Sequence, residues 1–133
     1  MIVLDASAAL ELVLRTPAGE IVARRIAPPE ESLHAPHLIV LEVAQVLRRY
    51  EAIRSLSPAR AREALEDFTD LAVTRYPHEV LLPRIWELRK NAAAYDGAYL
   101  ALAEVLGAPL LTADSRLAST PGHRAQVEVV SSS

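Results

Sequence analysis

The sequence predicts an α/β fold in which short parallel strands are covered by helices on both faces. Short, mostly apolar stretches occur at Ile2–Leu4 and Leu110–Thr112, as expected for strands buried on both sides. Between them a hydroxyl residue followed by proline recurs at Thr16-Pro17 and Ser57-Pro58, which is a typical helix start. The length of 133 residues and the 51% hydrophobic content suit one compact domain, expected to span residues 1–133.

The first half of the chain predicts one strand, two short helices, a second strand and two longer helices. The first strand ends at Asp5, and Ala-rich helical sequence follows at once, as in the first strand–helix unit of a parallel sheet. The helices are expected over Ser7–Leu14, Pro17–Ile26, Leu38–Ala52 and Pro58 to about Leu71, with the second strand at Leu33–Ala35.

The second half alternates strands and helices in the same way. Strands are expected over Ala72–Tyr76, Leu110–Thr112 and Val127–Val130, and helices over His78–Lys90 and Tyr95–Leu106. In the first of these helices Pro83 is best tolerated near the first turn. Gly107, with Pro109 just beyond it, ends the second.

Composition excludes several kinds of site. The chain has no cysteine, so any metal must bind through oxygen or imidazole. No apolar run is long enough to span a bilayer and no signal peptide is visible, so a cytoplasmic location is expected. The net charge of -3 does not indicate a nucleic-acid binder, although Arg24-Arg25 and Arg48-Arg49 offer forked donors for phosphate or carboxylate.

Four acidic residues are expected at one rim of the sheet. Asp5 and Asp114 follow strands, while Glu42 and Asp96 lie in the opening turns of helices. In right-handed strand–helix–strand units a helix begins at the carboxyl edge of the preceding strand, so both kinds of position share that edge. Ligands bind at this edge in open α/β sheets. The sequence therefore predicts that these acids converge.

Clustered carboxylates need a cation. Two carboxylates about 4 Å apart repel by roughly 4 kcal/mol at an effective dielectric near 20, and a bound divalent ion removes that cost. Oxygen ligands without cysteine or a histidine cluster favour Mg²⁺ or Mn²⁺ over Zn²⁺. Such ions promote phosphodiester cleavage by activating a water and neutralising charge on the phosphate. The predicted chemistry is phosphoryl-ester hydrolysis.

Each acid also has a structural interpretation. Asp5 can simply follow a strand, Asp114 can cap the short helix after it, and Asp96 is favoured near a helix start by the macrodipole. Glu42 is more informative, because it interrupts an apolar helix start and a carboxylate there needs solvent or a partner.

Nearby polar and aromatic residues are less specific. Ser7 and Thr112 either hydrogen-bond the acids or cap strand ends. The histidines have unrelated spacings and are expected to be structural or exposed. With 5% aromatic content, Trp86, Tyr95 and Tyr99 fit helix packing better than a base-stacking surface.

Four segments together resemble the PIN-domain family, and within it the VapC-type toxins of bacterial toxin–antitoxin pairs. They occur in the family's order, and the resemblance extends over essentially the whole chain. The segments are Ile2–Ala8 (IVLDASA), Leu38–Ala44 (LIVLEVA), Tyr95–Ala103 (YDGAYLALA) and Leu111–Ala118 (LTADSRLA).

The resemblance implies a three-layer α/β/α sandwich with a five-stranded parallel sheet in the order 3-2-1-4-5. It implies an Mg²⁺- or Mn²⁺-dependent endoribonuclease, a toxin that cleaves structured cellular RNA to limit translation and growth. The implied partners are RNA, a cognate VapB-like antitoxin and a second copy in a homodimer. By motif match the catalytic residues are Asp5, Glu42, Asp96 and Asp114, the metal ligands are Asp5, Asp96 and Asp114, and the supporting residues are Ser7, Thr112 and Arg116.

Two positions depart from the family pattern. Ala93 stands where many relatives have Ser or Thr, which weakens a helix cap, and Leu117 replaces a further acid, which leaves one-metal and two-metal sites open. Two other functions also remain open: a PIN nuclease that matures RNA, and a non-catalytic receiver-like binding module. A receiver usually has a lysine near its end, whereas Lys90, the only lysine, lies in a predicted helix.

Overall fold

A computed structural model describes residues 1–131 and shows a five-stranded sheet, all parallel, in the order β3-β2-β1-β4-β5. The strands are β1 (Ile2–Leu4), β2 (Leu33–Pro36), β3 (Val73–Tyr76), β4 (Leu110–Thr112) and β5 (Val127–Val129). The implied strand order is confirmed. All residues of β1 and β4 are buried, as expected for central strands covered on both faces.

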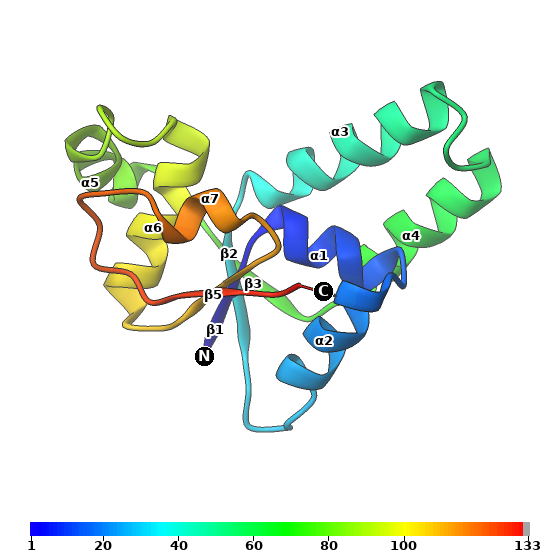
Figure 1. Ribbon diagram of the computed structural model, residues 1–133, viewed down its shortest axis with the longest axis horizontal. Coiled ribbons are helices and arrows are strands. Elements are labelled where there is room, and N and C mark those ends of the chain that lie inside the picture. The colour runs from blue at the N-terminus through cyan, green and yellow to red at the C-terminus, as the bar shows by residue number, and fades with distance from the viewer. Residues whose placement is uncertain (132–133) are drawn as a thin grey trace.

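Helices cover both faces of the sheet and complete the predicted three-layer sandwich. In Figure 1, α1 to α4 lie to the right of the sheet and α5 and α6 to the left. Helix α6 packs on β1, β2 and β4, and α1 contacts β4. The helices are α1 (Ala6–Val13), α2 (Pro17–Ile26), α3 (Ile39–Ala52), α4 (Pro58–Asp70), the 3₁₀ turn η1 (Glu79–Leu81), α5 (Leu82–Glu87), α6 (Ala94–Leu106) and α7 (Ser115–Ala118).

Local sequence signals set most helix ends. The side chains of Thr16 and Ser57 accept backbone N–H groups at the starts of α2 and α4, each with proline in the first turn. Gly107 ends α6 in the left-handed conformation, with φ of 60°. A Cβ on Gly19 would lie 2.0 Å from the carbonyl oxygen of Glu11, so only glycine lets α2 approach α1 this closely.

In the structure, the helix that was predicted over His78–Lys90 is shorter than expected and is interrupted. A 3₁₀ turn comes first, and α5 begins at Leu82 with Pro83 in its first turn, where the missing N–H costs nothing. The helix ends at Glu87, where the bonding tightens: the N–H of Leu88 is shared between Arg84 and Ile85, and that of Arg89 donates to Trp86 three residues back.

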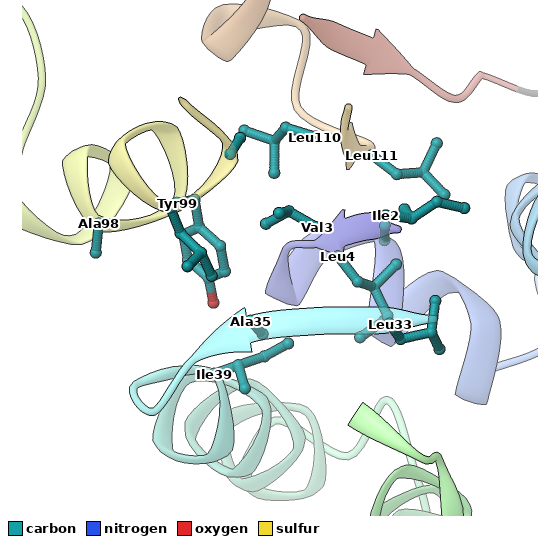
Figure 2. Close-up of a cluster of buried hydrophobic side chains, with 14 of the residues drawn as sticks. Ile2, Val3, Leu4, Leu33, Ala35, Ile39, Ala98, Tyr99, Leu110 and Leu111 are labelled. Atoms are coloured by element: carbon teal, nitrogen blue, oxygen red, sulfur yellow. The ribbon is translucent and has the colours of Figure 1, made fainter. Parts of the chain in front are cut away.

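The hydrophobic core surrounds β1 and holds in place the carboxyl ends of the central strands, where the acids lie. Aliphatic side chains of β1, β2 and β4 meet Ile39 of α3 and Tyr99 of α6 in this cluster (Figure 2). Strand β1 lies between β2 and β4, so the chain order reverses beside it and the carboxyl ends of β1 and β4 form the switch-point edge. Among residues 1–131, no helix has the length and apolar character needed to cross a membrane.

Candidate active site

Asp5 lies at the end of β1 and forms the N-cap of α1. Its Oδ1 accepts hydrogen bonds from the Ala8 N–H at 2.9 Å and the Ser7 hydroxyl at 2.7 Å. Its Oδ2 accepts the Thr112 hydroxyl at 2.5 Å. The side chain is 5% exposed, and burial raises its pKa despite these donors, which act in the opposite direction. Asp5 is therefore a desolvated carboxyl group held in one orientation.

The two predicted supporting hydroxyls join the ends of β1 and β4. Ser7 Oγ and Thr112 Oγ1 are 3.1 Å apart. Ser7 Oγ also accepts the Ala113 N–H at 2.9 Å, and Thr112 Oγ1 accepts the Asp114 N–H at 2.9 Å. Both residues thus hydrogen-bond Asp5 directly and tie it to the backbone that leads to Asp114.

Glu42 lies in the first turn of α3, half-buried beside the same edge. Its Oε1 accepts the hydroxyl of Tyr99 at 2.6 Å. Burial raises the pKa of Glu42, the Tyr99 hydrogen bond lowers it, and the charges of Asp5 and Asp96 raise it further. The partner that a carboxylate in this apolar helix start requires is a tyrosine hydroxyl.

Asp96 lies in the first turn of α6, where Ala93 occupies the N-cap without a side-chain hydrogen bond, as its residue type predicts. The carboxyl group is half-buried. Burial raises its pKa, the charge of Asp114 raises it too, and Arg116 acts in the opposite direction. Asp96 is therefore within electrostatic range of both Asp114 and Arg116.

Asp114 is paired with Arg116. Its Oδ1 accepts the backbone N–H of Arg116 at 3.0 Å and the Nε–H at 3.1 Å, and its Oδ2 accepts Nη2 at 2.7 Å. This fork lowers the pKa of Asp114. The next acid expected in many PIN proteins is replaced by Leu117, which is 2% exposed in the core.

The four predicted acids are electrostatically coupled. The charge of Asp114 raises the pKa of Asp5 and of Asp96. The charges of Asp5 and Asp96 raise the pKa of Glu42. Like charges grouped around a desolvated edge favour a bound cation, and the donors are all carboxylate oxygens, which fit Mg²⁺ or Mn²⁺.

Hydrogen bonds within the protein set the orientation of the acidic side chains. Within residues 1–131, no group of three acidic or histidine side chains is close enough to hold a metal ion. Two contacts explain this: the carboxylate of Asp114 is turned onto the Arg116 guanidinium, and both oxygens of Asp5 are hydrogen-bonded within the protein. The donor types fit the ion, and an ion bound through Asp114 would compete with the Arg116 fork.

Sequence reasoning missed the contact made by Tyr99. Its ring is 2% exposed, as helix packing predicts, but its hydroxyl reaches Glu42. Tyr99 lies one helical turn after Asp96, so it shares a face of α6 with that acid, and this spacing is the signal that was available. Trp86 and Tyr95 were expected to pack, and this was wrong: they are 64% and 66% exposed.

Comparison with known proteins places this arrangement in a family. The family model for the PIN domain matches residues 2–122. Ribonuclease VapC12 of Mycobacterium tuberculosis is 45% identical over 130 residues, which are 98% of this chain and 99% of that protein. Ribonuclease VapC9 of the same species is 47% identical over 130 residues, 98% of each chain.

Two solved structures share the fold. VapC20 of Mycobacterium tuberculosis, described as a toxin that cleaves the sarcin–ricin loop, has a TM-score of 0.68 at 15% identity, covering 93% of this chain and 97% of that one. PAE2754 from Pyrobaculum aerophilum has a TM-score of 0.67 at 24% identity, covering 95% of this chain and 82% of that one. With the family match and the relatives above, these findings show that the chain belongs to the PIN-domain family, among the VapC ribonucleases.

Proposed function

We propose that this protein is a divalent-metal-dependent endoribonuclease and the toxin of a type II toxin–antitoxin pair, and that it cleaves structured cellular RNA. The observation that supports this most strongly is the group of four coupled acids at the switch-point edge of the sheet. Relatives at 45% and 47% identity over nearly the whole chain are named ribonucleases.

The residues have distinct roles in this proposal. Asp5, Asp96 and Asp114 would hold Mg²⁺ or Mn²⁺, and the bound ion would supply a more acidic water and neutralise charge on the scissile phosphate. Ser7 and Thr112 fix the carboxylate of Asp5 through their hydroxyls. Glu42 takes a proton from the attacking water, a role that its raised pKa favours.

A groove between α3 and α4 supports the antitoxin as partner. Its volume is about 770 Å³, and Figure 1 shows these two helices extending away from the sheet. Apolar side chains, two arginines and one glutamate line it, which suits an amphipathic segment that folds on binding. The lining residues are Ala44, Leu47, Arg48, Glu51, Pro58, Ala59, Ala61, Arg62 and Leu65. A basic antitoxin side chain that reached the acids would compete with the metal.

Three further parts of the proposal concern assembly and location. A homodimer would cover the exposed apolar side chains of η1 and α5, namely Val80, Leu82 and Trp86. We also propose that residues 1–133 make up a single nuclease domain, which the core cluster supports by joining side chains from Ile2 to Val130. The protein acts in the cytoplasm, where its RNA substrate and antitoxin are made.

The test is cleavage of a panel of structured RNAs by the purified protein, with Mg²⁺, Mn²⁺ or excess chelator. We expect cleavage with either ion and none in chelator, together with growth arrest in cells that is relieved by co-expressing the neighbouring small gene. Full cleavage in chelator would exclude the metal. A protein that cleaves RNA, is harmless in cells and binds no product of an adjacent gene would instead be an RNA-maturation nuclease.

A further inference from the structure

Tyr99 brings a buried hydroxyl to the edge where the acids lie. Figure 2 shows its ring running from α6 toward the end of β2 and the start of α3, with the oxygen at the far end from α6. The ring is 2% exposed, and the hydroxyl donates to Glu42 Oε1 at 2.6 Å, a contact between residues 57 positions apart. A short hydrogen bond to a carboxylate is among the stronger ones in proteins.

We propose that Tyr99 is a positioning residue that holds the carboxylate of Glu42 in place for RNA cleavage. This inference rests on the proposed function, because it assigns Tyr99 a part in the same reaction. Tyr99 itself touches neither the phosphate nor the metal and acts only through Glu42.

The direction of the hydrogen bond is fixed. Burial and the neighbouring Glu42 carboxylate raise the pKa of the Tyr99 hydroxyl far above its usual value, so the group keeps its proton. The backbone N–H of Ala6 interacts with the same oxygen and acts in the opposite direction. With Ala6 on one side as donor, the hydroxyl proton points at Glu42.

This arrangement uses one oxygen of Glu42 and leaves the other available. Within residues 1–131, the only hydrogen bond to the carboxylate is at Oε1, so Oε2 is left to act on a water or substrate. The Tyr99 hydroxyl also joins three elements, because Tyr99 is on α6, Glu42 on α3 and Ala6 directly after Asp5. These contacts thereby fix the position of the Glu42 side chain relative to Asp5 and Asp96.

Glu42 needs such a restraint. A glutamate has several rotatable bonds and gains freedom when unpaired. The charges of Asp5 and Asp96 disfavour its ionised form and repel it from the site. The tyrosine hydroxyl opposes both effects, since it stabilises the ionised carboxylate at one location.

A purely structural explanation makes a different prediction. A buried tyrosine hydroxyl needs an acceptor, and Glu42 would then serve the stability of Tyr99 alone. In that case removal of the hydroxyl would change the melting temperature but not the rate of cleavage. The two explanations therefore separate when rate and stability are both measured on the same variants.

The experiment is a double-mutant cycle with Tyr99→Phe and Glu42→Gln, which keep the ring and the side-chain length. Single-turnover cleavage with Mn²⁺, RNA affinity and thermal unfolding in chelator are measured for each. Tyr99→Phe should slow cleavage about 10- to 100-fold with RNA affinity unchanged, as expected for a misplaced catalytic group. The double variant should cleave no more slowly than Glu42→Gln alone. Tyr95→Phe, on the same helix but exposed, should behave as wild type.

Glu42→Asp is a second variant that keeps the carboxylate but shortens its reach to Tyr99. The cleavage rate of Glu42→Asp should fall about as much as that of Tyr99→Phe, and should fall no further when the two changes are combined. If Tyr99→Phe folds poorly, the rate of Glu42→Asp alone still tests the inference. Wild-type cleavage by Tyr99→Phe, or effects that multiply with Glu42→Gln, would overturn the inference while the proposed function stands. A wild-type protein that cleaves no RNA, although unfolding in chelator still couples the two residues, would overturn the proposed function and the positioning role of Tyr99 with it.

Discussion

Replacing Asp96 by asparagine is expected to abolish divalent-dependent RNA cleavage while leaving the melting temperature of the metal-free protein unchanged or raised. Asp96 is a proposed metal ligand, and loss of several kcal/mol of transition-state stabilisation slows a reaction about a thousandfold. Stability should not fall, because burial and the charge of Asp114 disfavour the ionised form of Asp96 in the folded protein. Removing its charge relieves repulsion that Arg116 offsets only in part when the ion is absent.

The measurement combines cleavage rates in Mg²⁺ and Mn²⁺ with thermal unfolding in chelator. Asp70→Asn is a matched control, since Asp70 is the exposed last residue of α4 and lies outside the group of acids. It should cleave at the wild-type rate. Full activity of Asp96→Asn, or an inactive variant that is also unfolded, would contradict the role given to Asp96.

Replacing Arg116 by alanine is expected to tighten Mn²⁺ binding in the absence of RNA and to slow RNA cleavage. The guanidinium forms a fork with Asp114, so it competes with the metal for a ligand. The arginine is largely exposed, with 83% of its side chain accessible, so the gain in affinity should be modest, roughly two- to fivefold. Once displaced by the ion, Arg116 is free beside the site to pair with a phosphate of the RNA, and its loss weakens that contact.

Calorimetry of Mn²⁺ binding gives the first effect, and cleavage at subsaturating RNA gives the second. Lys90→Ala removes an equal charge from an exposed position after α5 and serves as control. Weaker Mn²⁺ binding by Arg116→Ala would mean that the arginine orients Asp114 for the ion rather than competing with it.

Much of the fold could be predicted from local signals. The hydroxyl–proline pairs at Thr16 and Ser57 and the glycine at Gly107 set helix ends through interactions within a few residues, so the sequence alone locates them. The helix containing Pro83 was predicted too long, because the 3₁₀ turn before it and its early end have no local signal of that kind. The strand order came from the family resemblance, since short apolar strands do not specify their neighbours.

The positions of the four acids could be predicted, but their side-chain contacts could not. Connectivity rules bring Asp5 and Asp114 to one edge, and the motif positions add Glu42 and Asp96. The fork between Arg116 and Asp114 depends on side-chain rotamers, and the contact of Tyr99 with Glu42 joins residues 57 positions apart. Neither follows from spacing. The exposure of Trp86 and Tyr95 also depends on which elements pack against their helices, and this is set by the tertiary structure.

The most direct test of the metal site is an anomalous difference map from crystals soaked in Mn²⁺. We expect a peak bound by the carboxylates of Asp5, Asp96 and Asp114, with the Arg116 guanidinium turned away from Asp114. A map without a peak at these acids at saturating Mn²⁺, with the Arg116 fork still intact, would contradict the proposal that Asp5, Asp96 and Asp114 form a metal centre.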